Sequence, residues 1–324
     1  ATPGASIYYT LNGSEPSPSN GTLYTGPLTI RKTETVRAVA YRDGQQPTNI
    51  DTHTYIFPGQ ILSQGPRPPG FPATWGTRTP DYEMDPSLIG PVYSREEVTD
   101  SLRSLPSISV VMNVDDLFDG NNGFYANSDQ RGDQWERACS YEFFDFPNGA
   151  QIQLNGGIRA VGRASRSANR GKHNLRAVFR SEYGPTKLRF PLFPDTEVTE
   201  FNSLILRGGN GDSWLNPGVV ERAQYIRDQW HRDAQRETGQ PFQHQIYAHL
   251  YLNGLYWGMY HIFERFEDDM LAAHYGGREE DWDAIKDAVD ALEVPVIANG
   301  GIATKADVDA CLEQTGAAAV TSKV

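Results

Sequence analysis

The sequence predicts an α+β protein in which a small all-β sandwich precedes a larger domain of mixed strands and helices. Three observations predict this organisation. Short apolar runs separated by turn residues fill residues 1–57. Residues 107–287 combine strand alternation with one stretch of helical periodicity, and residues 288–324 have the pattern of a βαβ fragment of α/β-barrel type. The intervening residues 58–106 are rich in proline and glycine and form the predicted linker.

Composition and charge exclude several classes of function. The 324 residues carry a net charge of −12, which disfavours non-specific binding to nucleic acid. Cys139 and Cys311 are the two cysteines, too few for a disulfide framework or a Cys/His metal site. The sequence has no apolar run near the ~18 residues of a membrane span and no signal peptide. Because Ala1 already lies inside a strand-like pattern, we expect a fragment of a longer protein.

Residues 1–57 contain a series of short strand candidates. They are residues 7–11, 28–30, 36–41 and 52–57. The pattern YYTLNGSEPS…GTLYTGPLTI…TVRAVAY resembles the C-terminal domain of chitobiase and β-hexosaminidases, with Asn12 where that family usually has Asp. The resemblance implies a spacer sandwich or a carbohydrate-side accessory module.

The end of the linker and the start of the next domain carry clearer local signals. Ser94, followed by Glu96 and Glu97, indicates an N-cap and the first turn of a helix. Residues 107–112 form an apolar run typical of a buried strand, and residues 135–146 alternate like a second strand.

A basic stretch follows, in which nine Lys or Arg residues between Arg159 and Arg189 are opposed only by Glu182. Guanidinium groups match phosphate oxygens, and interspersed glycines let the backbone approach a ligand, so the stretch suggests a polyphosphate site. Lys172 lies at the mouth of an alternating strand over 173–180, where a kinase needs a lysine for nucleotide phosphates. The alternative is a solvated basic face that pairs with acids elsewhere.

Residues 219–236 show the periodicity of an amphipathic helix. Its apolar positions are Val219, Ala223, Ile226, Trp230 and Ala234. Asp228 falls off this stripe, beside Arg227. A carboxylate in that position can orient a hydroxyl nucleophile and accept its proton. The alternative is a surface aspartate that pairs with its neighbouring arginine.

Asn253-Gly254 predicts a type I′ hairpin over residues 246–264. A two-residue loop predicts the apolar pairs Leu252–Leu255, Leu250–Trp257 and Ala248–Met259, and the opposite pairs Tyr251–Tyr256, His249–Gly258 and Tyr247–Tyr260. Continued alternation places Glu264 on the second, polar face. Glu267 and Asp268 follow at once, so the sequence predicts a Mg²⁺ site at the end of the hairpin. The alternative is a group of acids that stabilises a helix N-terminus.

Several motifs in order resemble the CotH kinase family over residues 60–286. They are GIRAVGRASR…GKHNLRAVFRSEYGPTKLRFPLF, FNSLILRGGNGDSW, RAQYIRDQW and HLYLNGLYWGMYHIFERFEDD. The resemblance implies a divergent protein-kinase-like fold that uses ATP and Mg²⁺ to phosphorylate Ser or Thr of a protein substrate.

The same resemblance assigns roles to individual residues. Lys172, with Arg163 and Arg176, would hold the nucleotide phosphates, and Asp228 would act on the substrate hydroxyl. The metal would lie at Glu264 with a nearby acid, Glu267 or Asp268, although the family usually has Asp where this sequence has Glu267.

More narrowly, the motifs are similar to large secreted bacterial members of the CotH family. This similarity implies a location outside the cytoplasm or at the cell surface, with a cell-surface polysaccharide as a second candidate partner besides the protein substrate. The alternative function is a non-catalytic binding or adhesion protein that retains a kinase-like fold. Convergence of Lys172, Asp228 and Glu264 in one cleft would favour catalysis, and their scatter would favour binding.

The tail has a different character from the preceding domain. VPVIANGGIATKADVDACLEQTGAAAV predicts a buried strand over 294–302, a helix over 304–315 and a second strand from 317, and it resembles tRNA-dihydrouridine synthases. The resemblance implies that Asn299, Gly300 and Gly301 would lie near the phosphate of FMN. One barrel unit cannot bury its own strand on both faces. We therefore expect an inactive fragment. It is either the result of a misjoined reading frame or assembly, or an authentic C-terminal extension of the protein.

Overall fold

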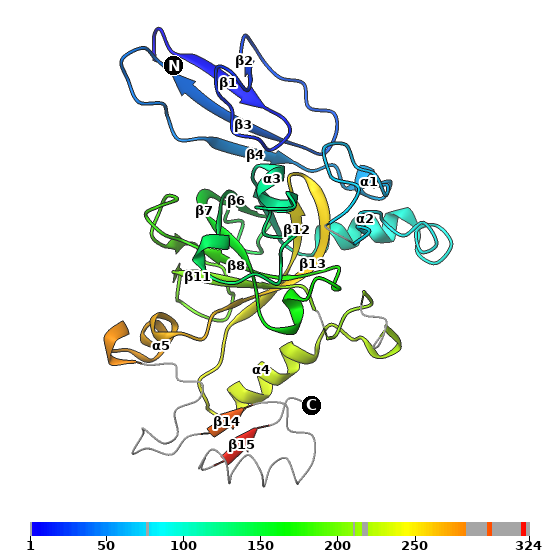
Figure 1. The fold of residues 1–324 in the computed structure, drawn as a ribbon. Helices are drawn as coiled ribbons and strands as arrows, with labels where there is room; N and C mark the ends of the chain where they lie inside the picture. Colours follow the sequence, from blue (N-terminus) through cyan, green and yellow to red (C-terminus); the bar gives the residue numbers. More distant parts are fainter. Residues whose placement is uncertain are drawn as a thin grey trace. The chain divides into compact units, whose positions relative to one another are not determined.

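The computed structural model describes residues 2–75, 78–209, 211–215, 220–282, 297–299 and 319–321. The chain divides into two compact units, Ala1–Arg265 and Phe266–Val324. Figure 1 traces their elements in chain order. None of the helices in these described ranges is long and apolar enough to cross a membrane.

The first unit begins with a four-stranded antiparallel sheet in the order β2-β1-β3-β4 (Figure 1). Its strands are β1 (Ser6–Thr10), β2 (Thr22–Leu23), β3 (Glu34–Tyr41) and β4 (Asp51–Tyr55). Three of the four lie where the sequence predicts strands. Residues 28–30 form no strand. Residues 22–23 pair with β1 instead.

Seven strands close into a barrel in the order β11-β13-β12-β5-β6-β7-β8. They are β5 (Ser107–Val111), β6 (Arg137–Phe144), β7 (Ile152–Val161), β8 (Asn174–Val178), β11 (Ser203–Arg207), β12 (Gln245–Leu252) and β13 (Leu255–Glu264). All neighbours are antiparallel except β12 and β5. The inward rows, with Ile108, Leu250 and Leu206 almost fully buried, form the main hydrophobic core.

Short helices and one small ladder complete the first unit. They are α1 (Pro58–Ile61), α2 (Arg95–Ser104), α3 (Val114–Phe118), α4 (Arg227–Glu237), the 3-10 turns η1 (Asp133–Trp135), η2 (Ala164–Arg166) and η3 (Val220–Arg222), and the pair β9 (Leu188–Arg189) with β10 (Glu200–Phe201). The predicted helix start at Ser94 is confirmed. Its hydroxyl accepts from the Glu97 amide at 3.2 Å, while the Glu97 carboxylate accepts from the Ser94 amide at 2.7 Å.

The hairpin of β12 and β13 forms as predicted, but its register shifts at a β-bulge. Leu252 pairs with Leu255 and Tyr251 with Tyr256, as the two-residue turn requires. Beyond that point Leu250 pairs with Gly258, so Trp257 is the extra residue of the bulge.

Because of the bulge, every predicted pair beyond Tyr256 is wrong. Ala248 pairs with Tyr260, His249 with Met259, and Tyr247 with His261. Because one inserted residue reverses which face the following side chains occupy, Tyr260 and Ile262 join the core. Glu264 continues this core-facing row, and its predicted position on the polar face is wrong.

Helix α4 begins later than the predicted start at residue 219 and docks by its polar face. Arg227 is its first residue, and Tyr225, two residues earlier, has φ 61°, which is incompatible with a continuous helix. Ile226 and Trp230, two positions of the predicted apolar stripe, are 58% and 66% exposed. The stripe therefore faces away from the barrel, although an amphipathic helix ordinarily buries its apolar stripe.

The second unit contains α5 (Asp268–Tyr275), η4 (Glu279–Asp281), β14 (Ile297–Asn299) and β15 (Ala319–Thr321). Strands β14 and β15 pair in parallel, with Ile297 opposite Ala319. The predicted tail also has two strands in these places. The helix predicted over 304–315, Cys311 and the glycines at 300 and 301 lie outside the described residues.

The tip of the hairpin gives a test of how β13 is held in register. Asn253 has φ 48°, and its amide bonds both the N–H and the C=O of Met112 at 2.9 Å. We expect Asn253→Ala to lower the free energy of unfolding by about 2 kcal/mol, since it loses both bonds and strains the turn. Asn253→Gly should cost about 1 kcal/mol less, because glycine accepts the positive φ. Urea denaturation measures both, and equal losses would contradict the turn strain.

Candidate functional site

A polar pocket opens between the outer face of the barrel and the N-terminal end of α4. Its cavity volume is about 10 Å³, room for roughly one water molecule, and it is lined by Arg207, Gly209, Asp212, Tyr225, Asp228, Tyr247, Met259, Tyr260 and His261. The ladder of β12, β13 and β11 sets three of these residues side by side, since His261 pairs with both Tyr247 and Arg207. The bulge in β13 is what brings His261 into this outward row.

Asp228 lies in the first turn of α4 and forms an ion pair with Arg207 of β11. Its side chain is 20% exposed, so it borders the pocket and is not a free surface group. Arg232, one turn later, donates to the Asp228 carbonyl at 3.2 Å and lies over the ring of Phe263 at 4.0 Å. These contacts fix the helix by its charged face. Asp228 therefore pairs with a strand residue, and the predicted alternative of a simple pair with Arg227 is wrong.

The loop before α4 is held by a network centred on Asp212. The carboxylate of Asp212 accepts from the amides of Gln224 at 2.7 Å and Arg227 at 3.4 Å. Tyr247 donates its hydroxyl to the carbonyl of Tyr225 at 2.6 Å. Tyr225 is held at a positive φ that costs energy for a bulky residue, and such strain concentrates at functional sites.

Asp212 is a pocket residue that the sequence interpretation missed. Its signal was an acid that follows a buried strand and several glycines, in the segment LILRGGNGD. The glycines indicate a loop after the strand, and such a loop can present a carboxylate.

His261 is a second pocket residue that sequence reasoning missed. It is 5% exposed and stacks on Tyr247, with ring centroids 4.4 Å apart and planes 11° apart. Burial, together with Arg232 and Arg207, lowers the pKa of His261 to about 3. Its Nε2 has no hydrogen-bond partner within the described part of the chain. The imidazole is therefore neutral at physiological pH.

Lys172 adjoins the wall of the pocket without being one of its lining residues. Its ammonium donates to the Met259 carbonyl at 2.5 Å and lies 4.4 Å from the ring centre of Tyr260, and both of those residues line the pocket. Two glycines make room for it. A Cβ on Gly208 would lie 2.9 Å from its Cγ, and one on Gly258 would lie 3.1 Å from its Nζ.

The ammonium of Lys172 has no carboxylate in ion-pair range among the described residues. Burial lowers the pKa of Lys172 to about 7, because a desolvated ammonium loses its charge more easily. A ligand that brings negative charge next to Nζ would reverse this effect. Lys172 is thus the one predicted phosphate-binding residue that lies beside the pocket.

Three other arginines of the basic stretch are engaged in ion pairs. Arg159 pairs with Asp133 at 3.1 Å and Glu136 at 3.4 Å, and Arg180 contacts the same two acids. Arg189 pairs with Glu200 at 2.9 Å. The predicted alternative, a basic face that pairs with acids elsewhere, describes these residues better than a polyphosphate cluster does.

The two other predicted phosphate ligands lie away from the pocket lining. Arg176 donates to the Ser203 hydroxyl at 3.2 Å across the ladder of β8 and β11. Arg163 is exposed and directly precedes η2. Neither is among the residues that surround Asp228.

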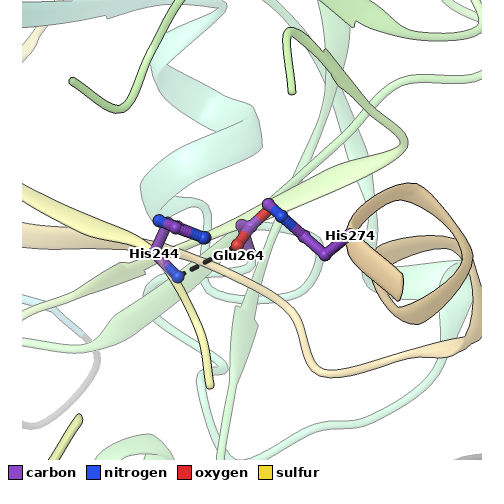
Figure 2. A group of neighbouring side chains, drawn as sticks. All are labelled: His244, Glu264 and His274. Atoms are coloured by element: carbon purple, nitrogen blue, oxygen red, sulfur yellow. Dashed lines mark hydrogen bonds between the residues drawn. The ribbon is translucent and has the colours of Figure 1, made fainter. Parts of the chain in front are cut away.

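Glu264 is buried at the end of the core-facing row of β13, with 2% exposure. One of its oxygens accepts from the backbone amide of His244 at 3.0 Å, as Figure 2 shows. His244 in turn lies 2.9 Å from Asp195 through Nδ1. Glu264 does not line the Asp228 pocket, so the predicted convergence of Lys172, Asp228 and Glu264 is only partial.

The other predicted metal ligands belong to the second unit. Glu267 is the residue before α5, and Asp268 is the first residue of that helix. This is the arrangement of the alternative interpretation, in which acids precede and begin a helix. His274, also drawn in Figure 2, lies on α5 and is likewise part of the second unit.

Two family models match separate parts of the chain. Residues 1–55 match the family described as Fn3 associated, and residues 271–322 match dihydrouridine synthase (Dus). No curated protein matches the chain. The N-terminal sheet is therefore similar to an Fn3-associated module, and the C-terminal segment is similar to part of a dihydrouridine synthase. Residues 56–270, which contain the barrel and the pocket, are covered by neither match.

The buried ammonium of Lys172 predicts a specific pH dependence. Its pKa is lower in the folded chain than the 10.5 of an ordinary lysine, so the unfolded chain holds the proton more tightly between pH 7 and pH 10. Stability should therefore rise with pH across this window in wild type relative to Lys172→Met, by less than about 1.4 kcal/mol per pH unit. Urea denaturation at pH 7, 8.5 and 10 measures the difference. A difference that stays constant or falls with pH would contradict the burial of this charge.

Proposed function

We propose that the pocket at Asp228 is a phosphoryl-transfer site, and that the protein uses ATP and Mg²⁺ to phosphorylate Ser or Thr of a protein substrate. This makes it a CotH-like atypical kinase with a divergent protein-kinase-like fold. One observation carries the proposal. A pocket lined by the Asp228 carboxylate shares part of its wall, Met259 and Tyr260, with a buried lysine that contacts both residues and has no carboxylate partner among the described residues.

Lys172 is the residue that would hold the nucleotide phosphates. A lysine in a poorly solvated site gains charge stabilisation when a phosphate oxygen replaces water. Its stem is fixed between Gly208 and Gly258, so little side-chain freedom remains to be lost on binding. Arg163 and Arg176 are left out of this role because of their positions.

Asp228 would orient the substrate hydroxyl and accept its proton. Its carboxylate is held in place by the ion pair with Arg207, at the first turn of α4. An ionised carboxylate can accept a hydrogen bond from an incoming serine or threonine. Phosphoryl transfer depends mainly on positioning and charge stabilisation, which makes a rigidly held carboxylate suitable.

Mg²⁺ fits the oxygen donors of this pocket, since the ion uses one or two carboxylates together with phosphate oxygens and water. Asp212 and Asp228 are the carboxylates that line it. When bound, the metal would neutralise phosphate charge. These two residues replace Glu264, Glu267 and Asp268 in the proposal, because Glu264 faces the core and the other two belong to the second unit.

A second candidate function is a non-catalytic binding or adhesion protein. Partial convergence of the predicted site supports it, as does the exposure of the large apolar side chains of Trp214, Ile226 and Trp230. Its ligand would be a cell-surface polysaccharide or a protein. Both candidates place the chain outside the cytoplasm or at the cell surface.

For the segment 271–322 we propose an inactive part of a dihydrouridine synthase, since one barrel unit cannot enclose FMN.

Transfer from γ-labelled ATP to the protein itself and to dephosphorylated casein, with Mg²⁺ present, tests the kinase proposal. We expect Asp228→Asn to lower transfer by about 10²-fold or more, because the hydroxyl loses its proton acceptor and the metal loses one of its two carboxylates, while binding of ATP measured without Mg²⁺ persists. Lys172→Met should weaken ATP binding itself. Asp133→Asn, which alters an exposed acid outside the pocket, is the matched control and should behave like wild type.

The outcomes separate the candidates. Equal transfer by wild type and Asp228→Asn would overturn the role of the pocket. Absence of both transfer and ATP-induced thermal stabilisation in wild type would overturn the kinase and leave the binding protein. Yellow flavin that co-purifies with the full chain would contradict the inactive-fragment proposal.

A further inference from the structure

A buried carboxylate joins the N-terminal sheet to the barrel. Glu142 of β6 is 8% exposed, and its oxygens accept from Thr54 of β4 through both the amide, at 3.0 Å, and the hydroxyl. The hydroxyl of Thr54 also lies 2.7 Å from that of Ser109 in β5. The contact therefore covers an outward N–H of β4, the edge strand of the sheet, which would otherwise be an unpaired donor.

The surroundings of Glu142 offer little to stabilise a negative charge. Among the described residues, no lysine or arginine forms an ion pair with it. Its ladder neighbours on β5 and β7 are Ser109 and Gln153, which are uncharged. His53 on β4 is the titratable group that acts on it from the sheet. Burial raises the pKa of Glu142, and the bonds from Thr54 and the charge of His53 oppose this rise only in part.

The hydrogen-bond network has a place for one added proton. A neutral carboxyl can donate from one oxygen to the Thr54 hydroxyl, and that hydroxyl can turn to donate to Ser109. The other oxygen continues to accept from the Thr54 amide. Both carboxyl oxygens and the Thr54 amide and hydroxyl then keep a partner, so protonation removes the buried charge without breaking the contact between Glu142 and Thr54.

We infer that Glu142 is a proton-sensitive latch, which holds the N-terminal sheet on the barrel more tightly when it is protonated. The direction follows from linkage. The docked arrangement keeps this proton to a higher pH than a solvent-exposed glutamate does, so docking is strongest below the ordinary range of glutamate. It weakens as pH rises, until the docked carboxyl has also ionised. This inference is independent of the proposed phosphoryl transfer.

Other contacts between the N-terminal segment and the barrel involve groups that do not titrate. They confine the effect of Glu142 ionisation to the region around Thr54. Gln60 of α1 accepts from the Thr33 amide at 3.0 Å and donates to the Arg31 carbonyl at 2.9 Å. Gln64, four residues later, makes the same pair of bonds with the backbone of Tyr256 in β13, both at 2.9 Å. The two amides hold the sheet and the hairpin at any pH. Release of the latch thus opens the edge of β4 without separating the parts.

Hydrogen exchange at the Thr54 amide of the full chain measures directly how often the bond from this amide to Glu142 is broken. Exchange is followed by mass spectrometry with residue-level fragmentation between pH 4.5 and pH 7.5, and rates are corrected for intrinsic exchange. In wild type we expect protection at Thr54 to fall as pH rises. Glu142→Gln keeps an acceptor and a donor in the geometry of the neutral acid, so its protection should be independent of pH and match the acid value of wild type.

Two controls make the test specific. Glu142→Ala removes the acceptor and should lose protection at every pH. Glu200→Gln changes an exposed glutamate paired with Arg189 and should keep the wild-type profile. The latch is overturned if Glu142→Gln follows the same pH profile as wild type, if wild-type protection rises with pH, or if Glu142→Ala stays protected.

Discussion

The one-residue bulge in β13 is the constraint on which the rest of the barrel depends. It reverses which side chains of the strand face the interior of the barrel. Tyr260, Ile262 and Glu264 therefore face inward, while His261 faces outward beside Arg207 and Tyr247. The same irregularity places Gly258 at φ 110°, where the absence of a side chain lets Lys172 lie against the strand. A regular ladder would bury His261 in the core, turn Glu264 outward and remove the space for the lysine.

Local signals in the sequence predicted most elements. The Asn253-Gly254 turn, the Ser94 cap and the buried strand at 107–111 depend on neighbouring residues alone, and each forms where expected. The bulge was missed because alternation was extended through Gly258, although a lone glycine in a strand is itself a bulge signal. Closure of the barrel could not be predicted, since the parallel pairing of β5 with β12 joins residues far apart in the sequence.

The candidate site was predicted less well than the fold, and for a physical reason. Residue type and spacing identify groups that can bind phosphate, but they do not say which groups already have partners. Arg159 and Arg180 are typical phosphate ligands by composition, yet Glu136 and Asp133 engage both. Lys172 differs in two respects: it is buried, and no carboxylate among the described residues pairs with it, so its charge is uncompensated. Neither property can be read from one sequence.

The orientation of α4 links these observations to function. An amphipathic helix ordinarily buries its apolar stripe, but α4 turns Asp228 and Arg232 toward the barrel and leaves Ile226 and Trp230 exposed. Burial of Arg232 lowers its pKa to about 10, a sign that this arrangement costs desolvation. Paired charges in partly buried positions contribute more to a specific geometry than to stability. Because the apolar orientation would bury more hydrocarbon, the polar docking of α4 is best explained by the need to hold Asp228 at the pocket.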